Sequence, residues 1–292
     1  MAGIDLIAGP ATEPVSVSDM TTALGFPDIT DATLLAQLSS QLSDYIVAAR
    51  ANCEDYCRRA FITQTRLLRL DGWPSIRWRY NWAGYRAIDL PYSPLQSIFS
   101  VQYVDASGAV QTLLRDTEYG TSSVQYSYQL VRGNDMACAK IQSAWARPWP
   151  PIRMVPDNVL IKYRCGYGGP VTGSMGAGSK ILSGPAFNPD DAPLMAGETG
   201  TAVSVPGAGA QGATLNSFVA SIDALTGQAT LADAAQTAVV DATVWVGQQV
   251  PVAIVRAIKF LAQWYYEQGS IVDQALPRVV TNLLQPYVNE VS

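Results

Sequence analysis

The spacing of hydrophobic residues divides the first part of the chain into an arm and two helices. Residues 1–15 contain glycine and proline without a sustained period, which predicts an N-terminal arm. Over residues 16–59, apolar positions recur every three or four residues, as on the buried face of an amphipathic helix. Ser16 or Ser18 is a suitable N-cap for a first short helix, and Gly25 would end it before the long helix begins.

The period then changes from that of a helix to that of a strand. Residues 60–167 hold runs with alternating apolar and polar positions, separated by glycine, proline and aspartate, which predicts a β region. A hairpin is expected at residues 105–108, where Asp-Ala-Ser-Gly separates two such runs. The last strand of the region ends at the glycines that surround Tyr167.

Composition changes abruptly at Gly168. From there to Gly247 the sequence is rich in Gly, Ala, Ser, Thr and Val, and short alternating runs are separated by turn residues. Flexible linkers lack alternating valines, so this segment predicts a small all-β insertion. It contains one basic residue, Lys180, and six acidic ones, so it carries the whole net charge of −5.

A helical period returns after the insertion. Pro251 is well placed in a first helical turn and Gly269 at a helix end, so we expect a C-terminal helix over residues 250–268. A tail at 277–292 has a short helical pattern of its own.

Taken together, these patterns predict an α+β fold. We expect a helical bundle with a long N-terminal helix and a C-terminal helix, a β-hairpin or sheet region, and a small all-β inserted domain. The domain division is 1–167 plus 248–292 for the body and 168–247 for the insertion.

Composition argues against most enzyme classes. The chain has no histidine, which removes the commonest general base and the commonest metal ligand. Asp71 and Asp89 stand at strand ends, where isolated aspartates are usually turn residues rather than a catalytic pair. We therefore predict no catalytic residue, no cofactor and no metal site. The four cysteines are interpreted as small buried apolar residues.

Charge and hydropathy limit the partners. Charged residues make up only 15% of the chain, which favours a surface that faces other subunits. No basic cluster suggests tight binding of nucleic acid, and no apolar run is long enough to predict a membrane span.

One cluster of aromatic residues is interleaved with arginines. Such residues are enriched in protein interfaces, but they also cover cores, and the sequence favours neither interpretation; stacking on single-stranded bases is a more distant third. The candidate interface residues are Trp73, Trp78, Tyr80, Trp82 and Tyr85.

The apolar residues of the tail form a second candidate site. They follow the glycine that ends the last long helix, and such a terminal segment docks onto its own domain or onto a partner. We expect that removing the residues after Pro277 leaves the subunit folded and abolishes attachment to a partner. The candidate residues are Leu283, Leu284, Pro286 and Tyr287.

The order of several motifs resembles a known family. The chain contains AARANCEDYCRRAFITQTRLLRLDGWPS, then IDLPYSPLQSIFSVQYVDASGAVQTL, then WARPWPPIRMVPDNVLIKYRCGYG, and finally VPVAIVRAIKFLAQWYYEQ with LLQPYV. In this order and spacing they are similar to the head-tail connector (adaptor) proteins of long-tailed bacteriophages and gene-transfer particles. The departure is the insertion, since the family usually joins the GYG turn to the last helix directly. The inserted sequence is similar to a β module near the starts of phage fibre chains.

The resemblance implies a structural virion protein and not an enzyme. Its helices would pack into a ring, twelve-fold in this family, on the portal protein, to which the tail with Leu283, Leu284, Pro286 and Tyr287 would bind. The other partner would be a stopper or tail-terminator protein of the neck, and DNA would pass through the lumen without specific binding. The protein would be assembled in the host bacterial cytoplasm. Two alternatives stay open: a fibre-related protein that binds or cleaves glycans, which would need two placed carboxylates, and a nucleic-acid-binding module.

Overall fold

The computed structural model divides the chain into two compact units. One, called the body, comprises Met1–Gly9, Glu13–Gly166 and Pro251–Ser292, and the other comprises Pro10–Thr12 and Tyr167–Val250. The structure describes residues 3–26, 32–74, 87–116, 126–131, 139–144, 148–184, 200–223, 226, 228–269 and 275–289.

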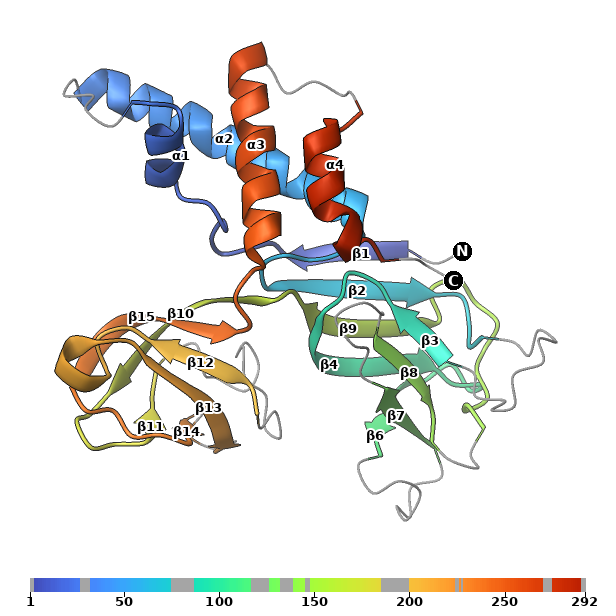
Figure 1. Cartoon of the computed structure of the whole chain (residues 1–292). Helices are drawn as coiled ribbons and strands as arrows, with labels where there is room; N and C mark the ends of the chain where they lie inside the picture. Colours follow the sequence, from blue (N-terminus) through green and yellow to red (C-terminus); the bar gives the residue numbers. More distant parts are fainter. Residues whose placement is uncertain are drawn as a thin grey trace. The chain divides into compact units, whose positions relative to one another are not determined.

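The helices of the body lie together on one side of its larger β-sheet (Figure 1). Ser16 caps the first helix in a reciprocal pair with Asp19: the Ser16 hydroxyl accepts from the Asp19 amide at 3.0 Å, and the Asp19 carboxylate accepts from the Ser16 amide. Gly269 ends the third helix at φ +68°, a conformation that costs glycine little. The helices are α1 (Val17–Ala23), α2 (Ala32–Cys57), α3 (Val252–Gln268) and α4 (Arg278–Leu284), followed by a 3₁₀ turn at Gln285–Tyr287.

The body also contains two β-sheets that share one hydrophobic core. Side chains from both sheets meet in this core, among them Leu68, Val101 and Ile161 from the larger sheet and Ile141 from the smaller one. The larger sheet is antiparallel, in the order β1 (Gly3–Ala8), β2 (Gln64–Leu70), β9 (Val159–Cys165), β4 (Leu95–Val104) and β5 (Val110–Thr112). The smaller has the order β3 (Ala87–Leu90), β8 (Ala139–Ser143), β7 (Ser127–Val131) and β6 (Leu114–Arg115).

Gly166 allows the body to end its ninth strand close to the α2–β2 connection. Its φ is +116°, and a Cβ atom there would lie 2.3 Å from the carbonyl oxygen of Ile62. Only glycine fits this approach, which explains the first glycine of the GYG turn.

The second unit is one six-stranded sheet whose two edges meet. Ser174 and Ser183 exchange both backbone hydrogen bonds, at 2.7 and 3.0 Å, and so join the first and last strands into a closed barrel. Its core is built from small aliphatic side chains such as Val205, Leu231 and Val244. The order is β10 (Gly168–Met175), β15 (Val239–Gly247), β12 (Ala202–Val205), β13 (Leu215–Ile222), β14 (Ala229–Leu231) and β11 (Ile181–Leu182), with a 3₁₀ turn at Ala210–Gly212. We call this unit the barrel.

The predicted helical bundle is wrong. In the described residues, strands in three sheets make up more of the structure than helices do, and the body is a two-sheet β structure with helices on one side. The helical period of α2 is conspicuous because it continues over 26 residues, whereas strands of two to ten residues give a weak signal each. The predicted arm is also partly wrong, because residues 3–8 form β1 against the distant strand β2.

Candidate functional site

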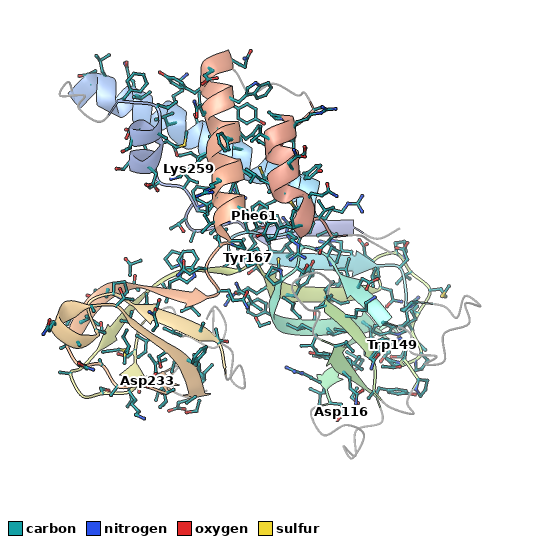
Figure 2. All side chains as sticks on the ribbon, in the orientation of Figure 1. Phe61, Asp116, Trp149, Tyr167, Asp233 and Lys259 are labelled. Atoms are coloured by element: carbon teal, nitrogen blue, oxygen red, sulfur yellow. The ribbon has the colours of Figure 1, made fainter. Side chains whose placement is uncertain are left out.

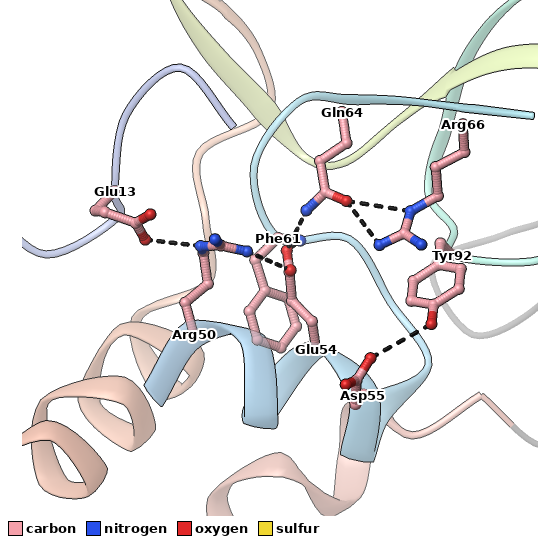
Figure 3. Close-up of polar contacts among 8 residues, drawn as sticks. All are labelled: Glu13, Arg50, Glu54, Asp55, Phe61, Gln64, Arg66 and Tyr92. Atoms are coloured by element: carbon pink, nitrogen blue, oxygen red, sulfur yellow. Dashed lines mark hydrogen bonds and ion pairs between the residues drawn. The ribbon is translucent and has the colours of Figure 1, made fainter. Parts of the chain in front are cut away.

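A connected set of polar side chains joins α2 to the larger sheet of the body (Figure 3). Glu54 lies on α2 and is buried. One of its carboxylate oxygens, Oε1, accepts hydrogen bonds from the Phe61 amide and the Gln64 side chain, both at 2.7 Å. The other, Oε2, accepts from the Arg50 guanidinium at 2.5 Å. Glu54 therefore holds the end of α2 and the start of β2 in one arrangement.

The connected set of polar side chains extends from the Glu54 carboxylate in two directions. Arg50 also pairs with Glu13 at 2.7 Å, which attaches the segment before α1 to α2. Gln64 in turn accepts two hydrogen bonds from Arg66, whose guanidinium lies over the Tyr92 ring at 3.4 Å from its centroid. Burial raises the pKa of Glu54, while Arg50 and the two hydrogen bonds from Phe61 and Gln64 oppose that rise. The set is a structural joint: each of its charged groups is occupied by a protein partner (Figure 3).

The Glu54 joint was not predicted from the sequence. A signal for it was present, because Arg50 and Glu54 are four residues apart and lie in the same helical stripe as the buried Ile46 and Cys57. Paired opposite charges within an apolar stripe indicate a buried ion pair with a partner outside the helix.

Trp73 is the one residue of the predicted aromatic interface that lies within the described residues, and it packs on the body core. Its ring stacks on that of Trp149 with centroids 4.4 Å apart and planes 6° from parallel, and its Nε1 donates to the Pro150 carbonyl at 2.9 Å. Figure 2 labels Trp149 in the β region of the body. The other four candidates, Trp78, Tyr80, Trp82 and Tyr85, lie outside the described residues.

The tail residues are placed differently from one another. Leu284 is fully buried in its own chain, and its carbonyl lies 4.0 Å from the Cys57 sulfur. Leu283 and Tyr287 are half-buried, and Pro286 is exposed. Leu284 is thus occupied by the body, whereas the other three keep some surface that a partner can contact.

Asn289 fixes the end of the tail to the body. Its side-chain nitrogen donates to the Arg58 carbonyl at 3.1 Å and the Ser93 hydroxyl at 2.7 Å. Its backbone N–H donates to the Cys57 carbonyl at 2.9 Å. These contacts indicate that removing the residues after Pro277 lowers the stability of the body; that the truncated subunit still folds stays a prediction.

The two aspartates that the sequence offered as a catalytic pair make structural contacts, and the described cysteines are buried. Asp89 pairs with Lys140 at 2.9 Å, and Asp71 accepts from the Asp157 amide at 3.2 Å. Cys53, Cys57 and Cys165 are buried free thiols. Burial raises the pKa of Cys57 and of Cys165 to about 12, so these thiols stay protonated and unreactive at neutral pH. Cys138 lies outside the described residues.

The part of the chain that the structure describes holds neither a metal-binding cluster nor a membrane-spanning helix. There, no three histidine, cysteine, aspartate or glutamate residues are grouped closely enough to hold a metal ion. Among the same residues, none of the helices has the length and apolar character needed to cross a membrane.

The chain resembles known proteins in structure but not in sequence. No family model and no curated protein matches the sequence. A chain from the structure "Virion of native gene transfer agent (GTA) particle" matches with a TM-score of 0.53 and 17% identity, over 99% of this chain and 96% of that chain. A chain from "Neck of empty GTA particle computed with C6 symmetry" matches with a TM-score of 0.51 and 17% identity, over 99% and 97%. The chain therefore shares a fold with these particle chains, and matches of this extent include the barrel as well as the body.

Proposed function

We propose that this protein is a structural subunit of the neck of a tailed-phage-like particle, an adaptor that forms a ring on the portal. The observation that carries the proposal is the fold shared over almost the whole chain with chains of a gene-transfer-agent virion and neck. The family motifs around the GYG turn and the last long helix lead to the same class.

The ring is the physical basis of the proposed role. The neck of the similar particle was computed with six-fold symmetry, which is compatible with rings of six or twelve identical subunits. Identical head-to-tail contacts close into such a ring when the rotation between neighbours divides a full turn. Twelve copies, as the family resemblance implies, would place the portal on one side and a stopper or tail-terminator protein on the other.

A ring of this kind would let DNA pass without holding it. Outside residues 168–247 the basic and acidic residues of the chain balance, and the excess of acid is confined to the inserted segment. Each phosphate held by a basic side chain adds salt-dependent affinity, so a lumen without clustered arginine and lysine favours sliding.

The tail of the chain is the proposed portal contact. Leu283, Pro286 and Tyr287 retain exposed surface at the end of α4, while Leu284 and Asn289 anchor this segment to the body. An anchored segment loses less conformational freedom on binding than a free one, which favours portal attachment here.

The barrel is proposed to be an accessory module outside the channel. It has its own core and closed backbone pairing, and its acidic charge is poorly suited to line a channel for DNA. Replacing Gly169–Val246 with a short Gly/Ser linker should leave a folded body that still forms rings. Loss of folding or of rings in this variant would mean that the barrel is an integral part of the subunit.

Co-purification with the portal of the same particle tests the proposed function. The chain and the portal are mixed and separated by size, and the co-migrating fraction is examined by electron microscopy. We expect a ring of this chain seated on the portal ring. The triple variant Leu283→Ser, Pro286→Ser and Tyr287→Ser should lose portal binding, and Val131→Ser, also on the body surface, serves as a matched control. A chain that ignores the portal but binds or turns over a glycan would contradict the proposal.

A further inference from the structure

The exposed face of α2 and the first half of the exposed face of α3 carry opposite charges. Arg50 is the one basic residue in the sequence of α2 and is buried, so the exposed charges of this helix are Asp44 and Asp55. On α3, the exposed stripe holds Val252, Arg256 and Phe260 in its first half and Glu267, which accepts from Gln263, near its end. Within the described residues, neither Asp44 nor Arg256 has an ion-pair partner.

Each of these faces also exposes apolar surface next to its charge. Phe260 is 49% exposed and follows Arg256 by four residues, while Val47 is 41% exposed and follows Asp44 by three. Residues three and four apart are neighbours on a helix surface. Each helix therefore presents a charge with an apolar side chain one turn away, and the two pairs are complementary in sign.

The two faces are separate surfaces of the helix pair. α2 and α3 pack together in the body, and the contact includes Asn52 of α2, which donates to the Tyr265 hydroxyl of α3 at 2.5 Å. On α3, Arg256 and Phe260 are about half a helical turn from the buried Tyr265. On α2, Asp44 is about a quarter of a turn and Val47 about 0.4 of a turn from Asn52, the residue that contacts α3. The α3 face therefore lies opposite the helix contact and the α2 face lies beside it, so the two are separate surfaces of one subunit.

We propose that these faces are the subunit contact: α3 of one copy docks on α2 of the next, with Arg256 against Asp44 and Phe260 against Val47. Two different patches on one subunit make a heterologous contact, which propagates from copy to copy and closes into a ring when the rotation between neighbours divides a full turn. This inference rests on the proposed function, since it names the surface through which that ring is formed.

Charge reversal tests the contact. Asp44→Arg places two cations at every contact, and Arg256→Asp places two carboxylates there. Each single variant should raise the protein concentration needed for half-maximal ring assembly by at least about tenfold, because like charges face each other across the interface. Both positions are exposed, so the circular dichroism spectrum and melting temperature of each variant should match those of the wild type. Arg115→Asp, an exposed charge reversal on β6, is the matched control and should assemble normally.

Two restorations make the test specific. The double variant with Asp44→Arg and Arg256→Asp regains opposite charges and should form rings. A mixture of the two single variants should also form rings, in which the two kinds of subunit alternate, whereas each assembles poorly by itself. Native mass spectrometry would find equal numbers of the two kinds in each mixed ring.

The possible results separate this inference from the proposed function. Single variants that assemble as the wild type does, or variants that fold but are not restored by mixing or by the double change, would overturn the α2–α3 contact and leave the ring subunit standing. A wild-type protein that forms no ring with or without the portal would overturn both.

Discussion

The body and the barrel are stabilised in different ways. The body joins helices and sheets through buried charged and polar side chains, with Glu54 at the centre and Asn289 at the end of the chain. The barrel closes its sheet through the backbone at Ser174 and Ser183 and fills it with small aliphatic side chains. A closed sheet leaves no free edge, whereas the body keeps the apolar edge strand β1 and two charged helix faces exposed.

This difference indicates where the protein can associate. A region that closes on itself is complete as a module, and a region with open edges and unpaired faces offers surfaces to a partner. The assembly contacts proposed above accordingly lie in the body. The comparison also predicts which kind of substitution damages each unit: loss of a buried polar partner in the body, and added volume at a close backbone approach in the barrel.

The largest effect is expected for Glu54→Ala. Removing this carboxylate leaves the Arg50 guanidinium, the Phe61 amide and the Gln64 side chain without their acceptor. Breaking a buried ion pair from one side costs about 3–5 kcal/mol, so the free energy of unfolding of the body should fall by that amount in a urea titration. Asp55→Ala, at the exposed neighbouring position, should change it by less than about 0.5 kcal/mol. Equal effects of the two variants would contradict the role given to Glu54.

The next largest effect is expected for removal of residues 278–292. This truncation exposes the surface that Leu284 covers, which by itself is worth about 1.5–3 kcal/mol, and removes the hydrogen bonds of Asn289. We expect a lower melting temperature of the body by calorimetry and an unchanged barrel transition. Asn289→Ala should reproduce part of the loss, and Val279→Ala, at a position 55% exposed, should reproduce almost none. A truncated chain as stable as the full one would make the tail a free arm.

A smaller and local effect is expected for Gly184→Ala in the barrel. A Cβ atom at Gly184 would lie 2.3 Å from the Thr172 carbonyl oxygen, beside the bridge that closes the sheet. Forcing extra volume into such a contact costs about 1–3 kcal/mol. Limited proteolysis should then cleave the barrel faster and leave the body intact. Gly178→Ala is the control. Its new Cβ atom meets open space, so this variant shows the effect of a methyl group at a left-handed φ of +74° without a close contact. Faster cleavage of the body as well would mean that the two units do not unfold separately.

The smallest effect is the pH dependence of the β4–β5 hairpin. The Asp105 carboxylate accepts from the hydroxyl and amide of Ser107, the amide of Ala109 and the side chain of Gln111. The hydrogen bond from the Ser107 hydroxyl has the largest effect. Together these hydrogen bonds lower the pKa of Asp105 to about 2 from its ordinary value of 3.8. Because the folded-state pKa is the lower one, the carboxylate stabilises the fold above about pH 4, and this is lost as pH falls towards 2. Asp105→Asn should lower the melting temperature slightly at pH 5, with the difference from wild type shrinking by pH 2.5. A constant difference across this range would rule out the carboxylate as its source.

The sequence predicted local elements well where one strong period or a specific turn residue defined them. α2 and α3 were confirmed, as were the Ser16 cap of α1, the Gly269 end of α3 and the hairpin turn that begins at Asp105. The proportion of strand to helix was predicted wrongly. For example, β1 forms only by pairing with β2, about sixty residues away, and no local period reveals such a pairing. Likewise, the glycines around Tyr167 were expected only to end the last strand of the body, whereas Gly168 begins the next strand, β10.

The candidate site was predicted less well than the elements. The apolar pattern of the tail was visible in the sequence, but the sequence does not distinguish Leu284, which its own body buries, from Leu283, which keeps exposed surface. The Asp44 and Arg256 faces require knowledge of how α2 packs on α3, because only that contact decides which stripe of each helix stays exposed. Such information is tertiary and is absent from the periods of the two separate helices.

Measuring the mass of the assembled protein tests the central claim most directly. The purified wild-type chain, alone and mixed with the portal of its particle, is measured by mass photometry over a range of concentrations. We predict one discrete assembly whose mass is a whole-number multiple of the subunit mass, with a closed ring in electron micrographs. A chain that stays monomeric in the presence of the portal, or forms open chains of indefinite length, would contradict the ring subunit proposed here.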